Sequence, residues 1–215
     1  MFRVLLMLSL CLPVAAVAGD AAPAGVPMPE AGARYGDRDP AAMAMHPRPG
    51  SRASFRRSLN AAIRKDPNNS VALLHRAYLF HAGGDLEEGD RDFQRVLRIT
   101  EAETDTVNRR RALWSLGWSA YNRGEPGQAV AYWQQASETF RGRASWYPYT
   151  LAVGLWAMDE REAALAWYDA AARSQTDWTR REGVQARTLH WREPEQRAAI
   201  ALFEAWSAAR PGAAP

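Results

Sequence analysis

The side chains of this chain that could do chemistry are mostly aromatic rings, because the usual catalytic groups form no recognisable motif. The four histidines are scattered, and His75 and His81 stand six residues apart, on different faces of a helix, which argues against a metal pair. The acidic run from Asp85 to Asp92 lacks the ligand spacing of a calcium loop. The sequence has no glycine-rich phosphate loop and no serine elbow. We therefore expect a non-enzymatic protein without a metal or cofactor.

Aromatic side chains, by contrast, recur at helical spacing. Trp114, Trp118 and Tyr121 follow one another at i, i+4 and i+7, so they share one side of a helix, while leucines and small residues share another. The same pattern returns further along the chain, where the aromatic side carries Trp146, Tyr149, Val153 and Trp156. Such rings bind apolar side chains and stack on sugar rings. They predict a binding surface.

Composition and charge limit the expected partners. Hydrophobic residues make up 47% of the 215 residues, which is enough for a core, and the formal net charge is only +3. Basic residues form no long block, so nucleic acid is not an expected partner. The densest basic run, Arg109 to Arg111, is expected to be the solvated start of a helix, with a phosphate contact as the alternative.

Residues 1–18 have the features of a signal peptide. Arg3 precedes an apolar run from Val4 to Leu12, and an A-x-A cleavage site ends at Ala18. The run is shorter than the roughly 20 residues that span a membrane. Cleavage would remove the only cysteine, Cys11, and with it disulfides, thiol catalysis and cysteine metal sites. We expect a periplasmic or secreted protein with no stable membrane span after cleavage.

The next part of the chain, residues 19–50, contains six prolines and many alanines and glycines without helical or strand periodicity. This composition predicts a flexible tether, with a partner-binding tail as the alternative. Helical patterning then continues over residues 51–210.

Helices in this part come in pairs. Ser51 to Lys65 is amphipathic and is stopped by the proline that follows Asp66. Val71 to His81 and Leu86 to Arg98 form a pair across two glycines. The clearest pair lies between Ala112 and Ala136, with its turn at Gly124. A third pair uses Asp159-Glu160 at its turn instead of glycine, which is expected to make that turn less tight.

The pairs resemble tetratricopeptide repeats, whose 34-residue motif alternates small and large packing residues. The small residues here are Gly117, Ala129 and Ala164, and the large ones are Phe93, Trp133 and Tyr168. Anchors at Phe55, Gly89, Ala129 and Ala164 are 34, 40 and 35 residues apart, and an insertion between Ile99 and Val107 accounts for the longer spacing. The resemblance implies an all-α fold, a right-handed α-solenoid of about four to four and a half helical hairpins. An unrelated helical bundle is the alternative.

In tetratricopeptide proteins the matching first-helix positions line a concave groove where peptides lie. The resemblance therefore implies a ligand groove of Tyr78, His81, Trp114, Trp118, Tyr121, Trp146, Tyr149 and Trp156. A fourth, degraded copy runs from Trp178 to Trp206, and there Arg181 and Trp191 hold the matching places. Trp118 and Trp146 fit packing between neighbouring first helices equally well. Positions that clamp a terminal carboxylate in chaperone-binding relatives carry no Lys or Asn here, which favours an apolar or aromatic-rich ligand.

The expected function is that of an exported interaction module, which holds a peptide or protein segment in this groove. The alternative is a scaffold that assists polysaccharide export or outer-membrane assembly, in contact with a glycan or with envelope machinery, because periplasmic tetratricopeptide proteins of similar layout have such roles.

Overall fold

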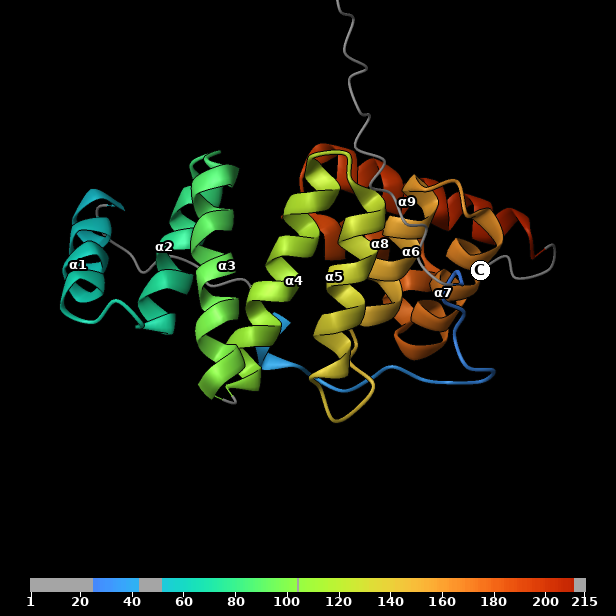
Figure 1. The fold of residues 1–215 in the computed structure, drawn as a ribbon. Coiled ribbons are helices and arrows are strands. Elements are labelled where there is room, and N and C mark those ends of the chain that lie inside the picture. Colours follow the sequence, from blue (N-terminus) through green and yellow to red (C-terminus); the bar gives the residue numbers. More distant parts are fainter. Residues whose placement is uncertain (1–24, 43–51, 104, 211–215) are drawn as a thin grey trace, which may run out of the picture.

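The computed structural model describes residues 25–42, 52–103 and 105–210, and the regular elements in these ranges are all helices (Figure 1). In chain order they are η1 (Pro40–Ala42), α1 (Arg52–Lys65), α2 (Ser70–Ala82), α3 (Leu86–Glu103), α4 (Thr106–Asn122), α5 (Pro126–Glu138), α6 (Tyr147–Ala157), α7 (Arg161–Ser174), η2 (Thr176–Thr179), α8 (Arg181–Thr188) and α9 (Glu193–Ala208). The predicted all-α fold is confirmed. The expected signal peptide, residues 1–18, lies outside the described residues.

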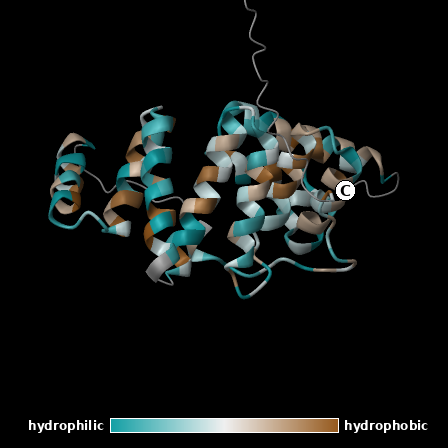
Figure 2. Cartoon of the chain, viewed as in Figure 1, coloured by the Kyte–Doolittle hydropathy of each residue, from teal (hydrophilic) through white to brown (hydrophobic). Residues whose placement is uncertain are grey.

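Consecutive helices pair as hairpins that lie side by side in a row (Figure 1). α2 packs with α3, α4 with α5, α6 with α7 and α8 with α9, while α1 covers α2 at one end. Each helix carries both hydrophobic and hydrophilic residues (Figure 2), as expected where one face is buried. Among the described residues, no helix is long and apolar enough to cross a membrane.

The core runs along the row as two buried clusters. One lies between α1 and α4 and includes Leu73 and Phe93; the other reaches from α4 to α9 and includes Trp133 and Tyr168. The half-buried side chains of Leu97 and Tyr132 contact both clusters. The large residues expected to fill the grooves between helices therefore do so: Phe93, Trp133 and Tyr168 are all fully buried.

Close helix approach depends on Gly117. A Cβ atom at this position would lie 2.2 Å from Nε1 of Trp133, well inside van der Waals contact. The glycine lets the backbone of α4 rest directly on the Trp133 ring of α5. This is the role that the repeat resemblance implied for the small residue at this place.

The insertion predicted between Ile99 and Val107 consists largely of helix. α3 continues to Glu103 and α4 begins at Thr106. Asp105 is the N-cap of α4, and its carboxylate accepts a hydrogen bond from the Asn108 N–H at 3.1 Å. The extra residues therefore lie mostly in helical turns added where α3 ends and α4 begins.

Three hairpin turns share one geometry. The residue that closes the turn has a positive φ in each: 89° at Gly84, 79° at Gly124 and 64° at Asp159. The N–H of the following residue bonds to the carbonyl five residues earlier at 2.9–3.0 Å, as in a Schellman motif. The turn at Asp159 is therefore as closed as the glycine turns, and the expectation of a looser turn is wrong.

Asp159→Gly is expected to stabilise the protein by about 0.5–1 kcal/mol, because glycine adopts positive φ without the Cβ clash that an L-residue meets. Within the described residues the Asp159 side chain pairs only with Arg161, and both are exposed, so little is lost with it. Urea unfolding measures the change. The reciprocal substitution Gly124→Asp should lower stability, and a loss of stability in Asp159→Gly would contradict the assignment of strain to this residue.

Residues 25–42 are not a free tether, because they lie along the row of hairpins (blue in Figure 1). Asp37 forms a parallel bridge with Ala144. The buried ring of Tyr35 lies 5.6 Å from that of Trp167, and the Trp167 indole donates to the carbonyl of Pro27 at 2.7 Å. The flexible tether predicted for residues 19–50 is therefore wrong for 25–42, and the rest of that range lies outside the described residues.

Asp39 fixes this segment to the solenoid through a buried ion pair. Its carboxylate accepts hydrogen bonds from Arg110 Nε at 2.7 Å and from Trp146 Nε1 at 3.0 Å. Arg110 is only 4% exposed. Its neighbour Arg111 donates to the carbonyl of Pro40 at 3.0 Å. The run from Arg109 to Arg111 is thus not a solvated helix start, because the N-terminal segment takes up donors of Arg110 and Arg111, while Arg109 donates to the carbonyl of Leu97 of α3 at 3.1 Å.

Candidate functional site

A pocket of about 390 Å³ lies where α2 and α4 face the connection between α8 and α9. Its aromatic lining residues are Tyr78, His81, Trp114, Trp118 and Trp191. Its polar lining residues are Ser115, Ser119, Asn122, Arg187, His190, Arg192 and Glu195. We call this site the aromatic pocket.

Four of the eight predicted groove residues line the aromatic pocket: Tyr78, His81, Trp114 and Trp118. They come from α2 and α4, the first helices of two neighbouring hairpins, as the repeat pattern implied. Trp118 also packs on the buried Trp133, with the ring centroids 5.0 Å apart. Trp118 therefore both lines the pocket and packs in the interior, which are the two alternatives that its sequence position left open.

The other four predicted residues lie outside the pocket lining. Tyr121 is half-buried beside Trp118, at 6.0 Å between ring centroids. Tyr149 packs at 5.1 Å from Trp178, within the hydrophobic core. Trp156 lies beneath the guanidinium of Arg161, which is 3.8 Å from the ring centroid.

Trp146 is a correction to the predicted groove. Its side chain is buried, at 3% exposed, and its indole nitrogen bonds to Asp39. It faces the N-terminal segment and not the pocket, because it is the N-cap residue of α6 and precedes the helical spacing that relates the other rings.

The last hairpin supplies a wall of the pocket through Trp191, which the repeat pattern had assigned to a first helix. α8 ends at Thr188, so Trp191 stands in the α8–α9 connection instead of on a first helix. Its ring lies 4.9 Å from that of Trp118 and 5.5 Å from that of Tyr149. Asn122 of α4 also donates to Glu195 of α9 at 2.8 Å. These contacts close the site at this end, so the expected groove is here a compact pocket.

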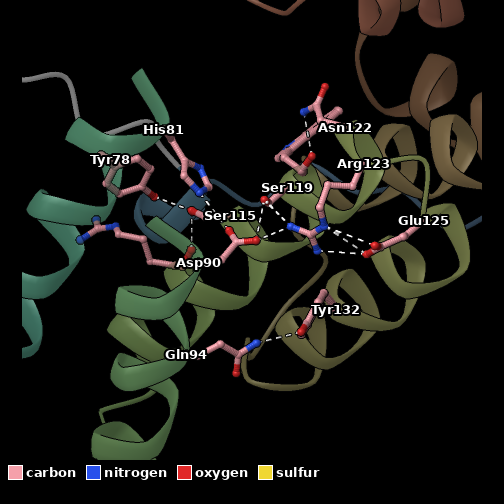
Figure 3. A network of polar contacts seen from close by, with 12 residues as sticks. Tyr78, His81, Asp90, Gln94, Ser115, Ser119, Asn122, Arg123, Glu125 and Tyr132 are labelled. Carbon is pink, nitrogen blue, oxygen red and sulfur yellow. Dashed lines mark hydrogen bonds and ion pairs between the residues drawn. The ribbon is translucent and has the colours of Figure 1, made fainter. Parts of the chain in front are cut away.

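A polar network orients one side of the pocket (Figure 3). Asp90 of α3 lies 2.9 Å from His81 Nε2, accepts a hydrogen bond from Ser119 at 2.8 Å and pairs with Arg123. Burial tends to raise the pKa of Asp90, but the hydrogen bonds from His81, Ser119 and Arg123 outweigh it and lower the pKa below its usual value. The network ties α2, α3 and α4 together and holds the His81 ring in place.

Burial also shifts the pKa of two further groups that line the pocket. Burial raises the pKa of Tyr78 to about 12, so its hydroxyl, 2.7 Å from Ser115 Oγ, is neutral at physiological pH. Burial also raises the pKa of Glu195, an effect that hydrogen bonds from Asn122 and from the Arg192 backbone N–H oppose. Both groups are engaged with neighbouring protein groups.

A larger hollow of about 1130 Å³ runs along α3, but its charged side chains largely pair with one another or with neighbouring helices. Arg91 pairs with Glu88 at 3.0 Å, and Asp92 pairs with Arg76 at 2.7 Å. In the described ranges, no three His, Cys, Asp or Glu residues are placed to hold a metal ion. The aromatic pocket is therefore the better candidate site.

Comparison with known proteins bears on the fold. No model of a known protein family matches the sequence, and no curated protein matches it. The row of paired helices does match solved structures. The chain is similar in fold to MamA. Its similarity to the crystal structure of MamA has a TM-score of 0.51 at 17% sequence identity, over 73% of this chain and 88% of that chain. MamA is a tetratricopeptide-like helical protein, so the likeness supports a helical repeat of that type here.

Proposed function

We propose that this chain is a non-enzymatic interaction module that binds a peptide or protein segment in the aromatic pocket. The observation that carries the proposal is the convergence of Trp114 and Trp118 from α4 with Trp191 from the last hairpin around one pocket. Tryptophan is strongly enriched among the residues that dominate binding energy at protein interfaces.

The size and rigidity of the pocket suit this role. Ligand pockets typically have volumes of about 300–1000 Å³, and this one lies near the lower end of that range. Trp133 supports Trp118 from behind, and Tyr149 supports Trp191. Walls held in this way lose little conformational entropy when a ligand binds, which favours affinity.

The proposed location is the periplasm or the extracellular space. It rests on the basic start, the apolar run and the cleavage motif within residues 1–18. Partners would then be envelope or secreted proteins. Envelope assembly and polysaccharide export are the processes that the second candidate function, a scaffold in contact with a glycan, would serve.

Loss of partner capture in pocket variants is the test of the proposed function. The mature protein expected from cleavage after Ala18 is used as bait in envelope extract beside Trp118→Ala and Trp191→Ala. We expect both variants to lose at least tenfold in capture of the specific partner, because each removes one wall of the pocket. Trp156→Ala, which truncates a tryptophan outside the pocket, is the matched control and should capture normally.

Far-UV circular dichroism and thermal unfolding must show that the variants keep the fold. Equal capture by the wild type and both pocket variants would place any binding site elsewhere and refute the proposal. Capture of a polysaccharide, with no protein retained by the wild type, would favour the scaffold function instead.

A further inference from the structure

Several hydrogen-bond acceptors of the aromatic pocket are already occupied. Glu195 accepts from Asn122 through Oε1 at 2.8 Å and from the Arg192 backbone N–H through Oε2 at 2.9 Å. Ser119 accepts from Arg123 Nη1 at 2.9 Å. Ser115 shares its oxygen with the Tyr78 hydroxyl, and one of the two groups donates to the other. The described lining residues therefore offer a ligand few vacant acceptors.

Unused donors remain in the same lining. The guanidinium of Arg192 makes no hydrogen bond or close ion pair within the part of the chain that the structure describes, and its charge acts on Glu195 at longer range.

The charges of the lining residues also favour a ligand that supplies acceptors. Among the lining residues, Arg187 and Arg192 carry positive charge against the single carboxylate of Glu195. Arg187 uses its Nε on Asp177 at 3.1 Å, an exposed pair that leaves its terminal nitrogens to other acceptors. A site with spare cationic donors and aromatic walls favours a ligand that is both anionic and aromatic.

We propose that the pocket recognises an aromatic side chain carrying a neighbouring carboxylate. The ring lies against Trp114, Trp118 and Trp191, and the carboxylate pairs with Arg192, assisted by Arg187. This inference rests on the proposed function and specifies its ligand. The carboxylate has two possible sources, the C-terminus of a chain that ends in an aromatic residue or an acidic side chain beside an internal aromatic residue.

The cations that make this recognition possible come from the last hairpin. The expected first-helix residues that do line the pocket, Tyr78, His81, Trp114 and Trp118, supply aromatic walls, and the expected Arg181 pairs with Glu204 and does not line it. Arg187 and Arg192 reach the site because α8 is short and the chain returns through the α8–α9 connection.

Three synthetic peptides separate the two sources. The first is acetyl-Gly-Ser-Gly-Phe with a free carboxylate, the second is the same peptide amidated, and the third is acetyl-Gly-Asp-Phe-Gly amide. Titration calorimetry with the purified protein should show that at least one acidic peptide binds about tenfold or more tightly than the neutral amide. The advantage should shrink as salt is raised. The acidic peptide that binds more tightly identifies the source of the carboxylate.

Arg192→Gln tests the proposed partner of the carboxylate. We expect it to weaken the acidic peptide about tenfold and to leave the neutral amide unchanged. Arg197→Gln on the same helix is the matched control, because its partner is the exposed Glu193 and it does not line the pocket. Trp114→Leu, which removes an aromatic ring from the pocket wall, should weaken all bound peptides severalfold and provides a second variant should Arg192→Gln fail to fold.

Equal affinities for acidic and neutral peptides, or an effect of Arg192→Gln no larger than that of Arg197→Gln, would overturn the inference while leaving the proposed function in place. No binding of either acidic peptide up to about 1 mM would also overturn it. Capture of a protein partner that ignores Trp118→Ala and Trp191→Ala would instead overturn the proposed function itself.

Discussion

Asp39→Ala is expected to lower the free energy of unfolding by about 3–5 kcal/mol. The substitution leaves Arg110 buried without its carboxylate partner, and an unpaired charge in a protein interior is strongly destabilising. It also leaves the buried Trp146 N–H without an acceptor. Urea unfolding followed by tryptophan fluorescence measures the loss.

A matched control for this substitution lies in the same segment. Glu30→Ala breaks an exposed ion pair with Arg143 and should cost less than about 1 kcal/mol. Replacing both charges, in Asp39→Leu with Arg110→Met, should restore part of the stability, because two apolar side chains leave no buried charge. Similar small losses for Asp39→Ala and Glu30→Ala would show that residues 25–42 contribute little to the fold.

Trp133→Ala is expected to have the second large effect and to lower the free energy of unfolding by about 3–5 kcal/mol. The indole is fully buried, donates to the carbonyl of Trp114 at 3.2 Å and lies directly against Gly117. The helices on either side, α4 and α6, are each packed against a further helix, α3 and α7, which limits how far they can move into the space. Urea unfolding again gives the free energy.

Trp156→Ala serves as the comparison for this truncation, because its ring is only half-buried and should cost much less. Trp133→Ala should also weaken ligand binding in whatever fraction remains folded, since Trp118 loses the ring behind it. A loss below about 1 kcal/mol would mean that the hairpins can repack around the missing ring.

The repeated hairpins could be predicted from the sequence because their cause is local. Glycines at Gly84 and Gly124 mark turns that need positive φ, and the spacing of small and large residues follows the helix period. The same periodicity placed Tyr78, Trp114 and Trp118 on the side of the helices that lines the pocket.

The parts that were missed depend on distant contacts. The composition of residues 25–42 resembles that of a linker, yet Asp39 is buried because Arg110, 71 residues later, needs a counter-charge. The sequence pattern placed Trp191 on the correct side of the solenoid. It did not place this residue in the α8–α9 connection, because no strong helix-breaking residue marks the end of α8 at Thr188. Neither feature produces a periodic pattern in the sequence from which it could be predicted.

The segment of residues 25–42 also changes how this protein unfolds. In a plain stack of hairpins each unit touches only its neighbours, so an end unit can fray while the others stay folded. Here one short segment contacts α4, α6 and α7 together, across sequence separations of 71 to 140 residues. Detaching α7 therefore loosens the support of α4 as well. The middle of the solenoid should melt as one cooperative unit, and the non-local closure it requires should make folding slower than the helical content suggests.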